Sequence, residues 1–259
     1  MYREDISGRV AFISGASAGI GEATAKALAS NGVNLILTAR RIDKLENLKN
    51  SFEKKYKVKV KIIKIDFSKS EEIVNALNSL EDEWKNIDIL INNAGLALNK
   101  DVYSNNLLED VLQMIRVNCE GLITATRILL PFILKSEHGH IINIASTAAD
   151  EAYSGGAIYC ATKSFVEMFG DALRIELIDK PVKVTNIKPG LVNTEFSTVR
   201  FKGDKEKADN VYKGLEPLLA EDIADNIEYV LTRKSHVQIS SMTIMAENQA
   251  TATMAYRKQ

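Results

Sequence analysis

Ser14-Gly15-Ala16-Ser17-Ala18-Gly19-Ile20-Gly21 closes the apolar run of residues 10–14 and leads into a helical pattern over residues 22–30. Glycine permits backbone conformations and close approaches that a Cβ would block. The start of a helix offers free N–H groups and partial positive charge, which suit a pyrophosphate. Three glycines alone are a weak signal, but their place between a first buried strand and a helix predicts a dinucleotide-binding βαβ unit. The alternative is a glycine-rich turn without a ligand.

Seven apolar runs of strand length recur along the chain, with helical patterns between them. They cover residues 10–14, 35–39, 60–65, 87–91, 141–145, 182–187 and 242–245. Several runs are almost wholly apolar, as in parallel strands covered by helices on both faces. Leu45, Leu48 and Phe52, at three- and four-residue spacing, mark a crossover helix between two of them. The sequence therefore predicts an α/β fold, a Rossmann-type doubly wound parallel sheet of about seven strands with helices on both faces.

A further helix is expected after the third strand. Ser70 is the predicted N-cap, and Glu71 and Glu72 are acids in the first turn. The apolar stripe of this helix continues to Trp84, which we expect in the core.

Composition bounds the number of domains and the class of partner. The 259 residues are 46% hydrophobic and 26% charged, with four prolines and no Gly/Ser-rich linker, so we predict a single domain over residues 1–259. Lys and Arg number 33 against 34 Asp and Glu, which leaves no net field to attract nucleic acid or anionic lipid. The basic run from Lys54 to Lys64 is interpreted as the solvated edge of a strand. We expect neither nucleic acid nor a membrane as a partner.

Cysteine usage and the first residues indicate the compartment. Cys119 and Cys160 lie far apart and match no metal or redox spacing, which fits a reducing environment. Residues 1–5 carry acids where a signal peptide needs an apolar core, and no apolar run approaches membrane-spanning length. We expect a soluble, cytoplasmic protein.

The end of the second strand selects the dinucleotide. An NAD site usually places an acid there for the ribose hydroxyls. Arg40 and Arg41 stand there instead, and two guanidiniums can pair with a 2′-phosphate, so the predicted cofactor is NADP. Asp43 would blunt this preference if its side chain turned back, and the alternative is two solvated arginines at a helix start. Asp66 and the stretch 92–95, after the next two strands, suit an adenine and a ribose.

Four residues predict proton transfer. Tyr159 and Lys163 are four apart in an amphipathic helical pattern, so they share one helix face. A phenol titrates near pH ~10, and a neighbouring ammonium favours phenolate and lowers that pKa. Ser146 closes the fifth strand, where its hydroxyl can hydrogen-bond a substrate oxygen. Asn118 would link a water to Lys163 or else be a satisfied buried amide.

In this order the motifs resemble those of the short-chain dehydrogenases/reductases, from about Gly8 to Met245, with no departure at the catalytic positions. The resemblance implies that Tyr159 is the acid/base and that Lys163 lowers its pKa and holds the nicotinamide ribose. It implies that Ser146 orients the reacting oxygen and that Asn118 anchors a proton relay through water. It also implies a homotetramer.

The same resemblance implies which residues contact NADP. They follow the ends of five strands and include two residues of the catalytic helix. The set is Gly15, Ser17, Gly19, Ile20, Gly21, Arg40, Arg41, Asp66, Asn93, Gly95, Tyr159, Lys163, Pro189, Gly190, Val192 and Thr194.

Substrate choice is expected in two loops, residues 147–157 and 193–213. Residues 138–144, 152–156 and 190–204 look like one subgroup of the family, the NADP-dependent 3-hydroxy acid dehydrogenases, which oxidise serine, L-allo-threonine and related acids. A carboxylate needs a cation, and Arg200 is the candidate bidentate clamp, the alternative being a structural salt bridge. His138 and His140 are too few for a metal site, and no metal is expected.

Three activities fit these residues. In the first, a 3-hydroxy acid is reversibly oxidised, and Tyr159 takes the hydroxyl proton as the carbon gives hydride to NADP+. In the second, NADPH reduces a carbonyl such as a dicarbonyl or 3-oxo ester. The third is a non-catalytic NADP(H)-binding sensor, since fold does not fix function. A sensor has no need of an activated phenol, which argues against it.

Overall fold

The computed structural model describes residues 3–258, and in this part of the chain all seven strands form one parallel sheet. Its order is β3-β2-β1-β4-β5-β6-β7, so the direction of winding reverses between β1 and β4. The strands are β1 (Val10–Ser14), β2 (Asn34–Ala39), β3 (Val60–Lys64), β4 (Ile89–Asn92), β5 (Gly139–Ile144), β6 (Val182–Pro189) and β7 (Ser241–Ile244). The predicted sheet is confirmed, and the strand ends differ from the predicted runs by two residues at most.

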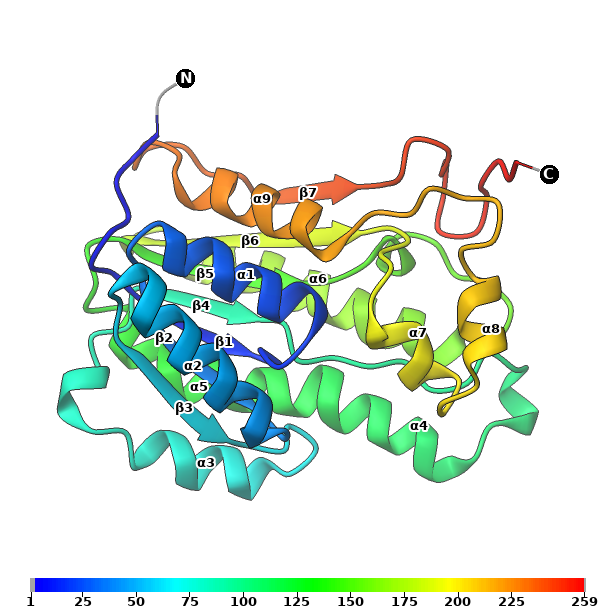
Figure 1. Ribbon diagram of the computed structural model, residues 1–259, viewed down its shortest axis with the longest axis horizontal. Helices are drawn as coiled ribbons and strands as arrows, with labels where there is room; N and C mark the ends of the chain where they lie inside the picture. The colour runs from blue at the N-terminus through cyan, green and yellow to red at the C-terminus, as the bar shows by residue number, and fades with distance from the viewer. Residues whose placement is uncertain (1–2, 259) are drawn as a thin grey trace.

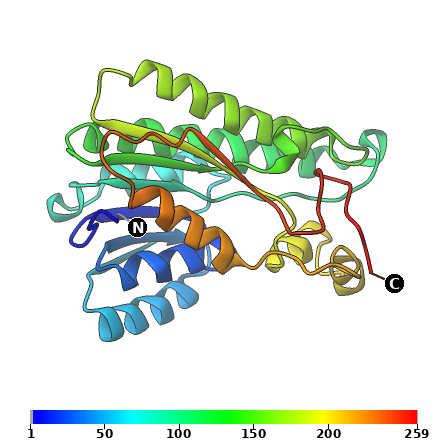
Figure 2. The same cartoon turned by 90° about the horizontal axis from the view of Figure 1, so that it is seen from above.

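Helices cover both faces of the sheet (Figure 1, Figure 2). One layer consists of α1 (Gly19–Ser30), α2 (Ile42–Tyr56) and α9 (Ala220–Leu231). The other consists of α3 (Ser70–Asn78), α4 (Leu108–Ile115), η3 (Arg116–Gly121), α5 (Leu122–Ile133) and α6 (Ala157–Glu176). Short helices complete the set: η1 (Asp82–Trp84), η2 (Tyr103–Asn105), η4 (Thr147–Ala149), α7 (Glu195–Arg200) and α8 (Lys205–Asn210). Within residues 3–258 no helix is long and apolar enough to cross a membrane.

Two neighbouring residues of β1 show why the central strands are wholly apolar. Phe12 packs into the core beneath α3, α5 and α6, whereas Ile13 packs into the core beneath α1, α2 and α9. Both are 0% exposed, because successive strand residues point to opposite faces and both faces are covered.

Three local predictions are wrong. The helix that begins at Ser70 ends at Asn78, so Trp84 lies beyond it in η1, although Trp84 is buried in the core as expected. The basic run of residues 54–64 is not the edge of one strand, because Lys54 and Lys55 end α2 and β3, at the edge of the sheet, begins only at Val60. Ser70 is not an N-cap but the first residue of α3, and its hydroxyl donates to Glu120 at 2.5 Å. A contact between distant segments thus replaces the local cap that the sequence suggests.

Three buried asparagines tie β4, β5 and β6 together across the sheet. Asn92 Nδ2 donates to Asn143 Oδ1 at 2.9 Å, and Asn143 Nδ2 donates to Asn186 Oδ1 at 3.1 Å. Asn186 Nδ2 continues the row to Asp171 Oδ1 of α6, also at 3.1 Å. A Cβ at Gly170 of α6 would collide with Asn186 Oδ1 and Asn143 Nδ2. This row of amides therefore fixes where α6 lies on the sheet.

Candidate active site

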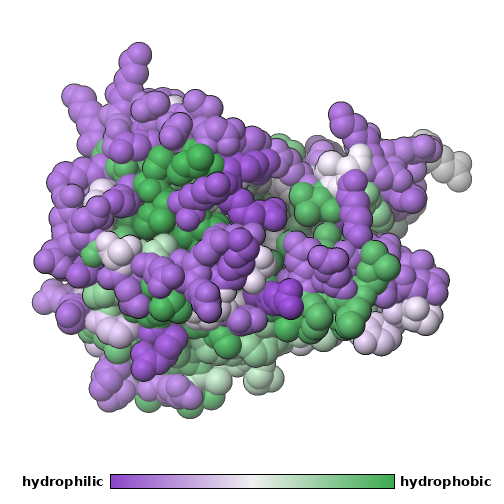
Figure 3. All heavy atoms as spheres, turned by 90° about the horizontal axis from the view of Figure 1, so that it is seen from below, coloured by the Kyte–Doolittle hydropathy of each residue, from purple (hydrophilic) through white to green (hydrophobic). Residues whose placement is uncertain are grey.

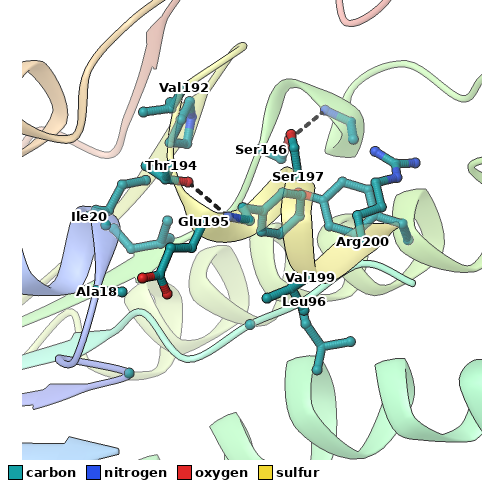
Figure 4. Close-up of a pocket in the computed structure, with 18 of the residues that line it drawn as sticks. Ala18, Ile20, Leu96, Ser146, Val192, Thr194, Glu195, Ser197, Val199 and Arg200 are labelled. Atoms are coloured by element: carbon teal, nitrogen blue, oxygen red, sulfur yellow. Dashed lines mark hydrogen bonds between the residues drawn. The ribbon is translucent and has the colours of Figure 1, made fainter. Parts of the chain in front are cut away.

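A cavity of about 710 Å³ opens at the carboxyl ends of the strands, beside α7 and α8. Ligands of doubly wound sheets bind at this edge, near the reversal of strand order. Figure 4 shows Ala18 and Ile20 on one side of the cavity and Ser146 and Arg200 on the other. Of the predicted site residues, all line the cavity except Gly21 and Asn118.

The glycine loop has the conformation that its sequence requires. Gly15 and Gly19 have φ angles of 66° and 54°, in the left-handed region that favours glycine. A Cβ at Gly21 would collide with Gly15 O and Asn93 Nδ2. Asn93 Nδ2 donates to Ser14 O at 2.9 Å and to Gly15 O at 3.1 Å. The absence of a side chain at Gly21 and the hydrogen bonds of the Asn93 amide thus fix the loop on the side away from the cavity.

The first turn of α1 is open to an anion. Its N-cap, Ala18, has no side chain that could accept a hydrogen bond from the helix. The first N–H groups of a helix have no partner within it, so here they remain available to a ligand. Because Ala18, Gly19 and Ile20 line the cavity, a pyrophosphate fits at this place.

The cavity wall at the end of β2 is cationic. Arg41 donates from Nε and Nη2 to Ser17 Oγ at 3.3 and 3.2 Å and from Nη1 to Glu195 Oε2 at 2.7 Å. Arg40 is exposed and makes no hydrogen bond or ion pair within the described part of the chain. Two guanidiniums here fit a 2′-phosphate.

Asp66 follows β3 on the same side of the cavity. Burial alone would raise the pKa of Asp66, but hydrogen bonds from Ser68 and the charge of Arg40 hold it below its ordinary value. Ser68 donates to Asp66 Oδ1 from its N–H at 2.9 Å and from its hydroxyl at 2.8 Å. The carboxylate is therefore ionised and held in place at the cavity wall.

Tyr159 lies near the start of α6, buried at the opposite end of the cavity. Burial raises the pKa of the Tyr159 phenol to about 12, although a hydrogen bond with Ser146 and the charge of Arg200 act in the other direction. Ser146 lies just after β5, where its Oγ also accepts a hydrogen bond from Ala148 N at 3.1 Å. The predicted meeting of a serine and a tyrosine is present.

Lys163 lies one turn further along α6, with Nζ 5.9 Å from the centre of the Tyr159 ring. Nζ donates to Ile144 O at 2.7 Å, and burial lowers the pKa of Lys163 to about 8. The expectation that Lys163 brings the pKa of Tyr159 below its ordinary value is wrong for this structure. The physical reason is that burial of the phenol has the largest effect on its pKa, and Lys163 is not among the groups that lower it.

Asn118 lies in the π-helical η3 and does not face the cavity. Its Oδ1 accepts from Leu96 N at 2.8 Å, and its Nδ2 donates to Leu96 O at 2.8 Å and to Thr162 Oγ1 at 3.0 Å. The amide side chain is therefore satisfied, as in the second interpretation of this residue. It holds the segment after β4 against the helix that carries Tyr159.

Arg200 ends α7 and points into the cavity. Its Nε donates to Asn99 O at 3.1 Å, its Nη2 donates to Tyr153 OH at 3.3 Å, and its Cζ lies 5.5 Å from the centre of the Tyr159 ring. It forms no salt bridge with any residue in the range 3–258. Lys100, also at the cavity, has its pKa lowered by burial and by the charge of Arg200. Within residues 3–258, no carboxylate forms an ion pair with Arg200 or Lys100, so this end of the cavity holds positive charge.

The residues after β6 form the wall between the two ends. Leu191 N donates to Gln249 Oε1 at 2.8 Å, which leaves no room for a Cβ at Gly190. Thr194 is the N-cap of α7, and its Oγ1 accepts from Phe196 N at 3.3 Å. Pro189 and Val192 line the cavity as predicted.

The cavity lining also includes residues that the sequence did not single out, among them Lys100, Tyr153, Glu195 and Arg257. Tyr153 and Glu195 lie in the two predicted substrate loops, and this position in the sequence could have identified them as site residues. Arg257 comes from the segment after β7, where its guanidinium donates to Lys213 O and Val211 O at 2.7 and 2.9 Å. No pattern in the sequence links that segment to the cavity.

The histidines do not indicate metal chemistry. Among the described residues no group of three or more His, Cys, Asp or Glu side chains is arranged to hold a metal. Burial lowers the pKa of His140 to about 3, and its Nε2 shares a hydrogen bond with Thr185 Oγ1 at 2.8 Å. His140 is therefore a neutral side chain of the sheet.

A glycine loop, an open helix start and a serine, tyrosine and lysine around one cavity define a dinucleotide-dependent oxidoreductase of the short-chain type. The profile of the short chain dehydrogenase family matches residues 9–205. The chain belongs to this family, and the resemblance inferred from the motifs is confirmed.

Particular relatives are similar along almost the whole chain. The NADP-dependent 3-hydroxy acid dehydrogenase of Schizosaccharomyces pombe is 44% identical over 255 residues, 98% of each chain. The enzyme of that name from Escherichia coli K12 is 40% identical over 251 residues, 96% of this chain and all of the relative. A solved closed form of serine dehydrogenase complexed with NADP+ superposes with a TM-score of 0.89 at 40% identity, over 96% of this chain and 100% of that one.

Proposed function

We propose that this protein is an NADP-dependent dehydrogenase that reversibly oxidises the hydroxyl group of 3-hydroxy acids such as serine or L-allo-threonine. One observation carries the proposal: the Arg200 guanidinium has no carboxylate partner in residues 3–258 and lies 5.5 Å from the Tyr159 ring. A 3-hydroxy acid has a carboxylate at C1 and a hydroxyl at C3, separated by a single carbon. A carboxylate held by Arg200 would thus bring the hydroxyl toward the phenol. The similar 3-hydroxy acid and serine dehydrogenases support this substrate class.

NADP fits the cofactor end of the cavity. The glycine loop and the start of α1 would take the pyrophosphate, and Arg40 and Arg41 the 2′-phosphate. Lys163 would hold the ribose next to the nicotinamide. When bound, NADP supplies a ring that accepts hydride from the substrate carbon.

The chain's own residues would move the proton. In oxidation Tyr159 Oη takes the proton of the substrate hydroxyl, and Ser146 Oγ hydrogen-bonds the same oxygen and orients it. Both N–H groups of the Asn118 amide are used, so a water relay at this residue would have only acceptors available, the second lone pair of Oδ1 or the backbone carbonyl. With a pKa of about 12, Tyr159 must lose a proton before it acts as a base, so the oxidation rate should rise with pH from neutral into the alkaline range.

The same residues would also serve a second candidate, NADPH-dependent reduction of a carbonyl compound such as a dicarbonyl or 3-oxo ester. A phenol that is protonated at neutral pH can donate its proton to a carbonyl oxygen without prior ionisation. The same residues serve both directions, so kcat/KM measured for each substrate class at neutral pH separates the two candidates.

The direct test is to incubate the purified protein with NADP+ and L-serine or L-allo-threonine and to follow the absorbance of reduced nicotinamide. The matched control substrate is L-serine methyl ester, which keeps the hydroxyl but lacks the carboxylate. We expect turnover of the acids and at most weak turnover of the ester. Equal turnover of acid and ester would contradict the role of Arg200. Binding of NADPH without turnover of any alcohol or carbonyl would support the sensor instead.

We also propose that the protein forms a homotetramer. Apolar side chains are exposed along one side of α4, α5 and α6, among them Leu108 at 69% and Met168 at 68% exposure. Figure 3 shows apolar side chains at the surface among charged ones in the view from below. Exposed apolar area of this kind marks contact sites between subunits. Light scattering should give four times the mass of one chain, and Met168→Glu should lower it.

A cytoplasmic location is part of the same proposal. Cys119 and Cys160 are both free thiols, and burial raises the pKa of Cys119 to about 11, so this thiol is inert at neutral pH. Cell fractionation with an antibody to the protein tests the location.

A further inference from the structure

Glu195 links the two ends of the cavity. It is the first residue of α7, the helix that Arg200 ends, yet its carboxylate reaches the start of α2. Glu195 Oε2 accepts from Arg41 Nη1 at 2.7 Å, and Oε1 accepts from Lys44 Nζ at 2.9 Å. Hydrogen bonds from Lys44 and Arg41 hold the pKa of Glu195 below its ordinary value, so it is an anion at neutral pH.

The Glu195 carboxylate forms an ion pair with Arg41, the guanidinium that the 2′-phosphate of the proposed cofactor also needs. Arg41 uses Nε and Nη2 on Ser17 and Nη1 on Glu195, so its donors are divided between a fixed loop and a carboxylate. A phosphate that binds a guanidinium bidentately requires two of those N–H groups. Two anions close to one cation also repel each other. A 2′-phosphate can therefore bind Arg41 fully only if Glu195 gives up this contact.

The surroundings of Glu195 allow that exchange. The side chain of Glu195 is 49% exposed, and those of Arg41 and Lys44 are 43% and 40% exposed, so no packing has to be broken. Lys44 remains as a partner for Glu195 after Arg41 is released. Arg40, without a hydrogen bond or ion pair in the part of the chain described, offers the phosphate a second guanidinium.

We propose that Glu195 is a specificity-determining residue that competes with the 2′-phosphate of NADP(H) for Arg41. The proposal rests on the use of NADP put forward above. Its consequence is selective: Glu195 weakens the binding of NADP(H) and leaves the binding of NAD(H), which has no 2′-phosphate, unchanged. The wild-type protein should therefore prefer NADP(H) over NAD(H) less strongly than Arg40 and Arg41 would without Glu195.

The test is Glu195→Gln, which keeps the size of the side chain and removes its charge. The dissociation constants of NADPH and NADH are measured by fluorescence titration of the purified protein, without substrate. We expect NADPH to bind on the order of threefold to tenfold more tightly to the variant, because the competing pair is half exposed and modest in strength. The dissociation constant of NADH should stay the same.

Glu206→Gln is the matched control. It removes the same charge from the neighbouring α8, outside the cavity lining, and should leave both constants unchanged. Unchanged thermal unfolding of Glu195→Gln establishes that the variant is folded. In an Arg41→Met background the effect of Glu195→Gln should vanish, since the competition acts through Arg41.

The possible outcomes separate the two proposals. Unchanged or weaker NADPH binding in Glu195→Gln, or an equal change for NADPH and NADH, would overturn the competition. Wild-type protein that binds NADH as tightly as NADPH would instead contradict the proposed cofactor.

Discussion

The two ends of the cavity are built in different ways. At the cofactor end, the side chains lie directly after β1, β2, β3 and β4, and several of them are held by hydrogen bonds to one another's segments, as between Asn93 and Gly15. At the substrate end, Lys100, Tyr153 and Arg200 come from the segments after three different strands, and the residues after β7 complete the wall. One end is fixed by the strand ends themselves, and the other depends on segments that meet far from any strand. Mutations at the two ends should therefore separate dinucleotide binding from substrate binding.

The largest effect, on kcat, is expected for Tyr159, which lies where the cofactor end and the substrate end of the cavity meet. Tyr159→Phe removes the Oη that carries the proton but keeps the ring that packs on Phe196. We expect kcat to fall about a thousandfold, because general acid–base catalysis supplies about 10²–10⁴-fold. The NADPH dissociation constant should hardly change. A variant with wild-type kcat would refute the proton-transfer role.

Arg200→Met should break the substrate end alone. Loss of a charge-assisted pair with a carboxylate should raise KM for the 3-hydroxy acid by about 10- to 100-fold. The KM for L-serine methyl ester and the NADPH dissociation constant should stay near the wild-type values. If the acid and the ester lose affinity equally, Arg200 supports the loop and does not bind a carboxylate.

Arg41→Met should weaken the cofactor end alone. Without this guanidinium, NADPH should bind about tenfold more weakly, and NADH should bind as in the wild type. Arg127→Met, which removes an exposed arginine of α5 outside the cavity lining, serves as the control. Titration of each variant with both dinucleotides measures the effect, and equal losses for both would assign Arg41 a structural role.

A separate expected effect concerns stability. The pKa of Lys163 is lowered to about 8 in the folded protein, so burying its charge opposes folding at every pH below that value. This penalty declines as the pH rises from about 8 toward the ordinary pKa of lysine. Lys163→Met should thus be more stable than the wild type at neutral pH, by on the order of 2 kcal/mol after loss of the Nζ hydrogen bond. The difference should narrow in denaturant unfolding at pH ~9, and a constant difference would contradict this origin.

Residues at the cofactor end could be predicted from the sequence more readily than residues at the substrate end. Gly15, Gly19 and Arg41 were predictable because each lies at a fixed offset from a strand that hydrophobic patterning identifies. Tyr159 and Lys163 were predictable because a helix brings residues four apart onto one face. All of these relations act over a few residues.

The remaining parts depend on long-range structure. Lys100, Glu195 and Arg257 are ordinary surface residue types, and only the order of β4, β5, β6 and β7 brings their segments together. The placement of Arg200 rested on resemblance alone. The pKa of Tyr159 went in the unexpected direction because spacing along a helix says nothing about how far water is excluded from a phenol that is 9% exposed. Ser70 failed as a cap because Glu120 of η3 offers its hydroxyl a partner 50 residues away in sequence.

The row of buried amides beneath α6 bears on attempts to redesign this protein. Because Asn143 and Asn186 fill the space that a side chain at position 170 would need, any residue larger than glycine there would lift α6 and displace the phenol on the same helix. A mutant library intended to alter the range of accepted alcohols should hold these three positions constant. It can place its diversity at Tyr153 and Arg200, whose side chains line the substrate end of the cavity.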